Sequence, residues 1–161
     1  MDKVKFPALE AVKWVILALA LVFLWNQAAQ GRESAADFQT VADQVIAASD
    51  LSNTLEGDNQ MVKRLYGLDP ADYEGVLLYY PATNMGSEEL LLVKLRDTSQ
   101  QEAVKAAIEA RVAGQMASFD GYGIDQYDML ERSITEVRGN YILLVSAADP
   151  TPIRQAFLDA L

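Results

Sequence analysis

Hydrophobic and polar positions divide the chain into a short apolar stretch near its start and a longer part in which the pattern changes several times. From Trp14 to Trp25, twelve consecutive residues carry no polar side chain, and the uncharged stretch continues to Gly31. Three lysines precede this run, whereas most of the charged residues after it are acidic. We therefore predict two parts, an N-terminal signal anchor over residues 1–31 with its apolar segment at 14–25, and a domain over residues 32–161.

Three interpretations of the apolar run are open. Twelve helical residues span about 18 Å, which is short of the ~30 Å hydrocarbon core, but neighbouring residues extend the run and its two tryptophans stand where a membrane interface favours them. A secretory signal peptide also has a basic start and a short apolar core, with cleavage at Ala29-Gln30-Gly31. A buried helix of a soluble core is the third interpretation, and the bracketing tryptophans argue against it.

Both of the first two interpretations predict the same topology. Positive residues concentrate before the apolar run, and such residues stay on the cytoplasmic side of a membrane. We expect a single-pass protein of the cell membrane, with its N-terminus in the cytoplasm and residues 32–161 outside. The alternative is a protein secreted after signal cleavage.

After the apolar run, the first pattern in the chain is apolar residues at helical spacing. Residues 35–49 repeat apolar side chains at helical intervals, and Ser34 is the predicted N-cap. A second short helix is expected from Asn59 to Tyr66, between the capping Asp58 and Gly67. These are the two leading helices of the domain.

The pattern then changes to that of β-strands, and a unit of two strands and a helix occurs twice. Each of two β-hairpins is followed by a helix, and a short helical or irregular piece over 125–131 precedes the second hairpin. The hairpins occupy 75–80 with 89–95 and 134–137 with 141–146. The longest helix is expected to be capped by Thr98 or Ser99, and the closing helix to begin at Thr151. The predicted fold is α+β: two leading helices, then a ββαββα antiparallel sheet with helices on one face.

Composition removes many chemistries. The chain has a net charge of −10 and contains neither histidine nor cysteine. Disulfides, thiolate nucleophiles and imidazole sites are therefore excluded. From Arg32 onwards there are ten basic and twenty-one acidic residues, so this part carries −11 and is not expected to bind nucleic acid. We expect no cofactor, no catalytic residue and no metal ligand.

Acidic residues gather in one glycine-containing loop, where Asp120, Asp125 and Asp128 lie close in sequence. Such a loop offers oxygen ligands to a hard cation, although its spacing matches no EF-hand; a solvated turn with capping aspartates is the other interpretation. Glu88 and Glu89 are expected to flank a strand and favour solubility. Lys94 is expected to face outward from its strand.

Arg111 stands out in the longest helix. It lies with Gln115 beside an apolar stripe that Tyr122 continues. A guanidinium at the margin of a core needs an oxygen partner. One interpretation is a structural tie to a loop, for instance the segment from Asp125 to Asp128, and the other is an anchor for an anionic group. Arg111, Gln115, Tyr122, Asp125 and Asp128 are the weak binding candidates.

Four short motifs, taken in order, resemble a family. They are Tyr66-Gly67-Leu68-Asp69, Val93-Lys94, Arg111-x3-Gln115-x3-Phe119-x2-Tyr122 and Gly139-Asn140-Tyr141. The family is a domain-of-unknown-function group of membrane-anchored or secreted envelope proteins of Gram-positive bacteria, and the likeness runs from Phe38 to Leu161. It implies a small α+β domain in the envelope and no catalytic residues. Many members resemble lipoproteins, whereas this chain has no lipobox cysteine.

These observations predict a membrane-anchored extracytoplasmic domain that binds an envelope protein or a small ligand through residues 32–161, without turning it over. Residues 14–25 would contact the membrane. The alternative is an envelope polysaccharide hydrolase that uses a pair of carboxylates. A structural cation-binding module is a third hypothesis.

Overall fold

The computed structural model describes residues 12–21 and 33–161. Residues 12–21 form a helix whose apolar side chains are exposed. Within these described ranges, no helix is both long and apolar enough to cross a membrane. The end of the predicted apolar segment, residues 22–25, and the predicted domain boundary after residue 31 lie outside the described residues, so the signal anchor stays a prediction.

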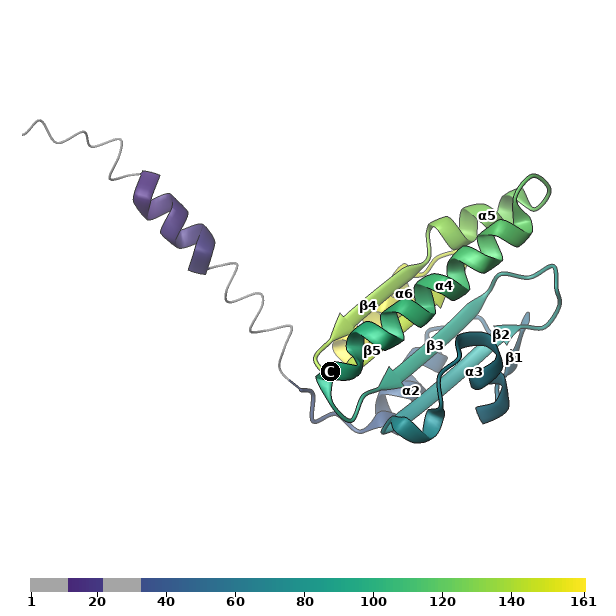
Figure 1. Cartoon of the computed structure of the whole chain (residues 1–161), viewed down its shortest axis with the longest axis horizontal. Coiled ribbons are helices and arrows are strands. Elements are labelled where there is room, and N and C mark those ends of the chain that lie inside the picture. The colour runs from purple at the N-terminus through teal and green to yellow at the C-terminus, as the bar shows by residue number, and fades with distance from the viewer. Residues whose placement is uncertain (1–11, 22–32) are drawn as a thin grey trace, which may run out of the picture.

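A five-stranded antiparallel sheet forms the centre of the domain (Figure 1). Its spatial order is β1-β2-β3-β5-β4, which places β3 and β5 side by side in the middle. The strands are β1 Thr54–Glu56, β2 Gly75–Pro81, β3 Glu89–Lys94, β4 Ile134–Arg138 and β5 Tyr141–Ser146. Both predicted hairpins are confirmed, and β1 adds a short strand at one edge.

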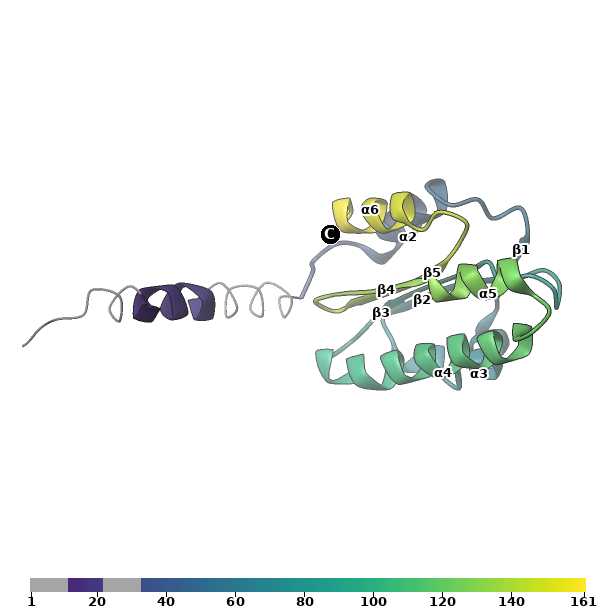
Figure 2. The ribbon, with the colours of Figure 1, turned by 90° about the horizontal axis from the view of Figure 1, so that it is seen from above.

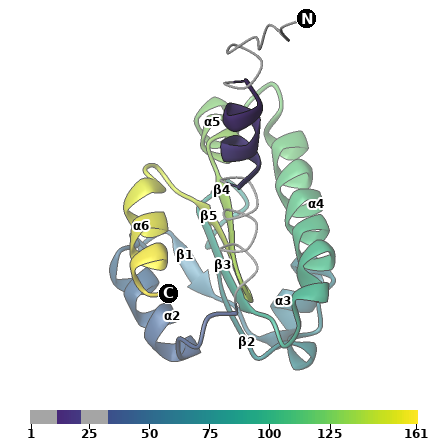
Figure 3. The same ribbon diagram turned by 90° about the vertical axis from the view of Figure 1, so that its left-hand side faces the viewer.

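Helices lie on both sides of this sheet (Figures 2 and 3). On one side are α2 and α6, and on the other are α3 and α4, with α5 packed against α4. Their bounds are α2 Phe38–Ala47, α3 Asn59–Tyr66, α4 Gln101–Phe119, α5 Ile124–Glu131 and α6 Thr151–Asp159. The mixed α+β class is therefore confirmed, but the prediction that helices cover one face is wrong.

The central strands explain this difference. All six residues of β3 and all six of β5 are buried, so neither strand has a solvent face. Leu91 and Val93 point to a core shared with α3 and α4, whereas Leu90 and Leu92 point to a second core beneath α2 and α6. A continuous apolar run, such as residues 90–93 of β3, is typical of a strand covered on both sides.

Two predicted helix starts need correction. The N-cap of α2 is Asp37, whose side chain accepts from the Thr40 amide, while Ser34 instead binds Asn140 with its backbone N–H at 2.8 Å. A 3-10 turn, Thr98–Gln100, precedes α4 and is capped by Asp97, so neither Thr98 nor Ser99 is the cap. In both places an aspartate near the predicted cap takes the role, because its carboxylate accepts helix N–H groups well.

The two ends of the sheet have different surroundings. Ser34 binds Asn140 in the β4–β5 turn, so the chain enters the domain at that end. β2 runs away from this end and finishes at Pro81, beside the start of β3 at Glu89. The candidate site lies at this far end.

Candidate functional site

A fully buried carboxylate, that of Glu89, lies at the far end of the sheet. Its side chain is 0% exposed, and it shares the face of the sheet that is covered by α3 and α4. The Tyr66 hydroxyl donates to Oε1 of Glu89. Arg111 donates twice, from Nε to Oε1 at 3.1 Å and from Nη2 to Oε2 at 2.8 Å, and Gln115 Nε2 donates to Oε2 at 2.9 Å. We call these four residues the Glu89 cluster.

Local structure explains how the donors converge. Arg111 and Gln115 are four residues apart on α4 and therefore share one helix face. Tyr66 is the last residue of α3, which ends because Gly67 adopts a left-handed conformation with φ of 68°. Glycine takes that conformation without steric cost, so the chain turns away immediately after Tyr66.

The cluster is electrostatically balanced. Burial raises the pKa of the Tyr66 hydroxyl well above its ordinary value, and the nearby Glu89 carboxylate raises it further. Burial by itself lowers the pKa of Arg111, but the hydrogen bonds and charge of Glu89 outweigh this and leave that pKa raised. Tyr66 therefore stays neutral and Arg111 stays charged, which gives the buried carboxylate the donors that it needs.

Two buried polar atoms beside the cluster have no hydrogen-bond partner in the described part of the chain. They are Oε1 of Gln115 and Oγ of Ser146, which lies opposite Glu89 in the β3–β5 register. Leaving a buried acceptor unpaired costs free energy. Gln115 also lines a pocket, so the residue that carries this unpaired, buried acceptor borders a space that a ligand can occupy.

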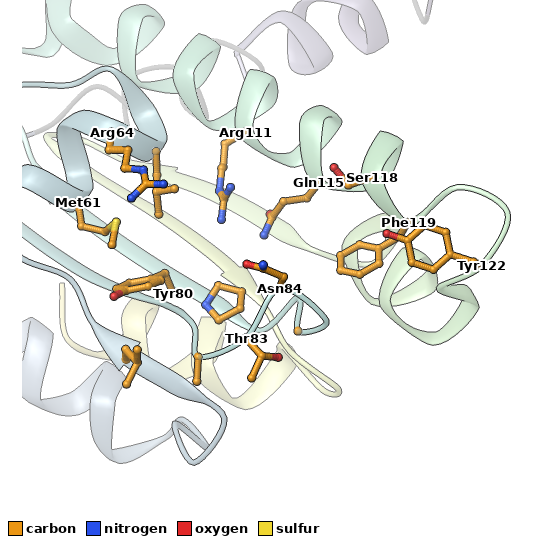
Figure 4. Close-up of a pocket in the computed structure, with 15 residues that line it drawn as sticks. Met61, Arg64, Tyr80, Thr83, Asn84, Arg111, Gln115, Ser118, Phe119 and Tyr122 are labelled. Atoms are coloured by element: carbon orange, nitrogen blue, oxygen red, sulfur yellow. The ribbon is translucent and has the colours of Figure 1, made fainter.

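The pocket has a volume of about 630 Å³ and lies between helices α3 and α4 and the β2–β3 hairpin loop. Figure 4 shows Arg111 and Gln115 reaching from α4 towards Tyr80 and Asn84, with Arg64 beside them on α3. The full lining is Leu55, Met61, Arg64, Leu65, Tyr80, Pro81, Ala82, Thr83, Asn84, Gly86, Arg111, Gln115, Ser118, Phe119 and Tyr122. This volume is within the range typical of small-molecule sites, about 300–1,000 Å³.

The charge of this pocket is opposite to that of the chain. Its lining includes Arg64 and Arg111 but no aspartate or glutamate. Within residues 33–161, Arg64 is the one Lys or Arg side chain that forms neither an ion pair nor a hydrogen bond with the described residues. A cationic pocket in a chain of net charge −10 indicates a site for an anionic group.

The structure brings three of the five predicted binding candidates together. Arg111, Gln115 and Tyr122 all line the pocket, although Tyr122 is 63% exposed. Asp125 and Asp128 lie on α5 with exposed side chains and do not line it. Arg111 has the oxygen partner that was expected of a guanidinium at the margin of a core, but that partner is Glu89 and not the segment from Asp125 to Asp128.

Two other sequence predictions are wrong. Glu89 does not serve solubility, because it is buried in the cluster. Lys94 does not face outward: its side chain is 8% exposed, and Nζ pairs with Glu74 at 2.5 Å. The sequence did contain one signal for the burial of Glu89. Alternate residues of a strand share a face, so Glu89 lies on the same face as the apolar Leu91 and Val93. Nothing in the sequence singles out Arg64.

The acidic loop gains no metal site from the fold. Among the described residues, no group of three or more acidic side chains is arranged to hold a metal ion. Asp125 stands in the first turn of α5, where an acidic side chain complements the helix dipole. The position of Asp125 is therefore explained by its stabilising effect on the start of α5.

Fold and pocket together define a small α+β domain with an arginine-lined cavity. The chain belongs to the family described as a domain of unknown function (DUF4358), which matches residues 47–147. The resemblance noted between Phe38 and Leu161 is confirmed to that extent, while the envelope and Gram-positive setting stays a prediction. No curated protein and no solved structure matches the chain.

Proposed function

We propose that this protein is a non-catalytic binding domain that takes an anionic ligand in the pocket beside the Glu89 cluster. The observation that carries this proposal is Arg64, a cation without a partner among the described residues, in a pocket whose lining has no carboxylate. Arg111 adds a second guanidinium, although Glu89 already balances its charge. Arginine presents a planar fork of donors that suits carboxylates and phosphates.

The pocket lining supplies binding groups but contains no carboxylate, lysine, histidine or cysteine. The Glu89 carboxylate binds the lining residues Arg111 and Gln115, and both of its oxygens accept hydrogen bonds from the cluster. The Ser118 hydroxyl donates to the carbonyl of Gly114 and has no base beside it in the lining. A hydrolase of the alternative type needs two carboxylates facing one cleft, and this lining offers none.

The proposed setting is the outer face of a cell membrane, in the envelope of a Gram-positive bacterium, as the family resemblance implies. The described helix over 12–21 supports a membrane tether, because its exposed side chains include Trp14, Ile16, Leu17 and Leu21. Exposed contiguous apolar surface favours a membrane or a partner. A tether would meet the domain at Ser34, at the end of the sheet opposite the pocket.

Ligand binding can be tested with a matched pair of probes. We would titrate the ¹⁵N-labelled full chain in detergent with 4-phenylbutyrate and with its neutral amide. The proposal predicts at least about tenfold tighter binding of the acid, with shifts at Tyr80, Asn84 and Gln115, and loss of this preference in Arg64→Gln. Lys63→Gln is the control, since Lys63 pairs with Asp69 and does not line the pocket. Equal binding of both probes, or none, would overturn the proposal.

The tether has a separate test. Expressed intact, the full chain should sediment with membranes and require detergent for release. Recovery of the full-length chain in the soluble fraction without detergent would rule out the anchor. Recovery of a shortened chain outside the cell would support the cleaved-signal alternative instead.

A further inference from the structure

We infer that the pocket recognises an α-amino-acid unit with a free carboxylate, such as the C-terminal residue of a peptide. In such a ligand a carboxylate and an N–H donor are attached to the same Cα, next to a side chain of variable character. The inference rests on the proposed function, because it uses Arg64 as the site of the negative charge. It adds a second polar contact and an apolar one.

The second contact is Oε1 of Gln115. Gln115 is 8% exposed, lines the pocket, and its Oε1 has no partner in the described part of the chain. Its Nε2 donates to Glu89 at 2.9 Å, so the side chain cannot flip without turning its oxygen towards a carboxylate. The acceptor is therefore fixed in place and lacks a donor, and because it lies below the pocket surface, a ligand N–H reaches it only where a neighbouring lining side chain moves aside.

These two contacts together select a class of ligand. A fully ionised inorganic anion pairs with Arg64 but has no N–H for Gln115. A neutral amide has an N–H for Gln115 but no charge for Arg64. A peptide C-terminus brings both, and its carboxylate fits the fork of an arginine. An acylated amino acid and a free amino acid share this chemistry.

The third contact is apolar. Met61 and Leu65 on α3, Tyr80 on β2 and Phe119 on α4 line the same cavity. The exposed loop that contains Thr83 and Asn84 forms another part of the lining and offers amide and hydroxyl groups. The C-terminal side chain therefore has an apolar surface to contact, and the preceding residue has polar groups along the loop.

The experiment compares close analogues by calorimetry on the full chain in detergent. The parent probe is N-acetyl-alanyl-leucine. One analogue carries a C-terminal amide in place of the carboxylate, and another carries an N-methyl group on the leucine nitrogen. Each change should weaken binding by about tenfold or more, because each removes one of the two polar contacts. Free leucine, run in parallel, distinguishes an amino acid from a peptide end as the source of the same chemistry.

Protein variants complete the comparison. Arg64→Gln should abolish the preference for the acid over the C-terminal amide, whereas Lys63→Gln should keep it. In Gln115→Met the parent and its N-methyl analogue should bind equally; if this variant does not fold, the two ligands on the unaltered chain still decide the question. Equal binding of parent and N-methyl analogue to the unaltered chain overturns the inference. If 4-phenylbutyrate still binds, the proposed function survives that result, and if no carboxylate binds, both fall.

Discussion

Arg111 holds the buried carboxylate of Glu89 with two hydrogen bonds, of 3.1 Å from Nε and 2.8 Å from Nη2. This pair connects α4 to the start of β3 and is the most buried ion pair in the described part of the chain. The same arginine lines the pocket, so one residue links the stability of the domain to its candidate site. The structural tie and the anion anchor, two interpretations of Arg111, are therefore compatible.

The first prediction concerns this pair. Arg111→Ala leaves the Glu89 carboxylate buried without its cation, and losing one partner of a buried pair costs about 3–5 kcal/mol. We expect a decrease of this size in the free energy of unfolding, measured with urea. Lys105→Ala on the same helix is the control, because its pair with Glu102 is exposed and its loss should cost less than about 0.5 kcal/mol. Unchanged stability of Arg111→Ala would show that Glu89 does not depend on its cation.

The second prediction is a pH dependence at the alkaline end. An unfolded tyrosine loses its proton near pH 10, whereas burial and Glu89 hold the pKa of folded Tyr66 well above that value. Below about pH 10 both states keep the proton, and above it only the folded state does. The unfolded chain then binds fewer protons, so the free energy of unfolding decreases as pH rises.

Urea denaturation between about pH 9 and about pH 11 measures this decrease. Tyr66→Phe should lose stability less steeply over this range than the unaltered chain. Tyr122→Phe is the matched control, since the Tyr122 ring is exposed, and its slope should equal that of the unaltered chain. Parallel slopes for Tyr66→Phe and the unaltered chain would mean that Tyr66 is not the group concerned.

The element order could be predicted from the sequence because hairpins, caps and helical spacing are local signals. Both hairpins, the end of α3 at Gly67 and the start of α6 at Thr151 are as expected. Which faces of the sheet are covered is not a local property. It depends on how α2 and α6 return to the same side, far apart in sequence, and on the continuous apolar runs of β3 and β5.

The candidate site was predictable only in part for the same reason. Arg111 and Gln115 could be recognised because a polar pair beside an apolar helix stripe is unusual. Glu89 and Lys94 were misplaced because charged strand residues ordinarily face water. Each is buried with a partner from another element, Arg111 of α4 for Glu89 and Glu74 for Lys94, and those partners come together only in the folded chain.

The third prediction compares two glycines, one in a crowded position and one with open space around it. A Cβ at Gly75, the first residue of β2, would lie 2.5 Å from the ring of Phe38, so Gly75→Ala must displace that ring. Overpacking of this kind costs about 1–3 kcal/mol. A Cβ at Gly114, inside α4, meets nothing within 4 Å, and alanine there should stabilise the helix by about 0.5–1 kcal/mol. Melting temperatures should therefore shift in opposite directions, and shifts of the same sign would contradict the packing around Gly75.

The last prediction concerns Lys94, which joins the start of the domain to the sheet. Its Nζ pairs with Glu74 at 2.5 Å, donates to the carbonyl of Ala36 at 3.1 Å and lies 5.5 Å from the centre of the Tyr141 ring. Burial lowers the pKa of Lys94, but Glu74 and Tyr141 outweigh that effect and leave it raised. The ammonium group is therefore charged and depends on its oxygen partners.

The two halves of this pair should respond differently to substitution. Lys94→Met keeps most of the buried stem and removes the charge, and half-exposed Glu74 can then bind water, so we expect a loss of less than about 1 kcal/mol. The Ala36 carbonyl keeps its hydrogen bond from the Tyr141 hydroxyl at 2.8 Å. Glu74→Ala instead leaves a buried ammonium without its carboxylate and should cost about 1–3 kcal/mol. Urea denaturation of both variants tests this order, and a larger loss in Lys94→Met would show that the ammonium stabilises the fold beyond balancing its own burial.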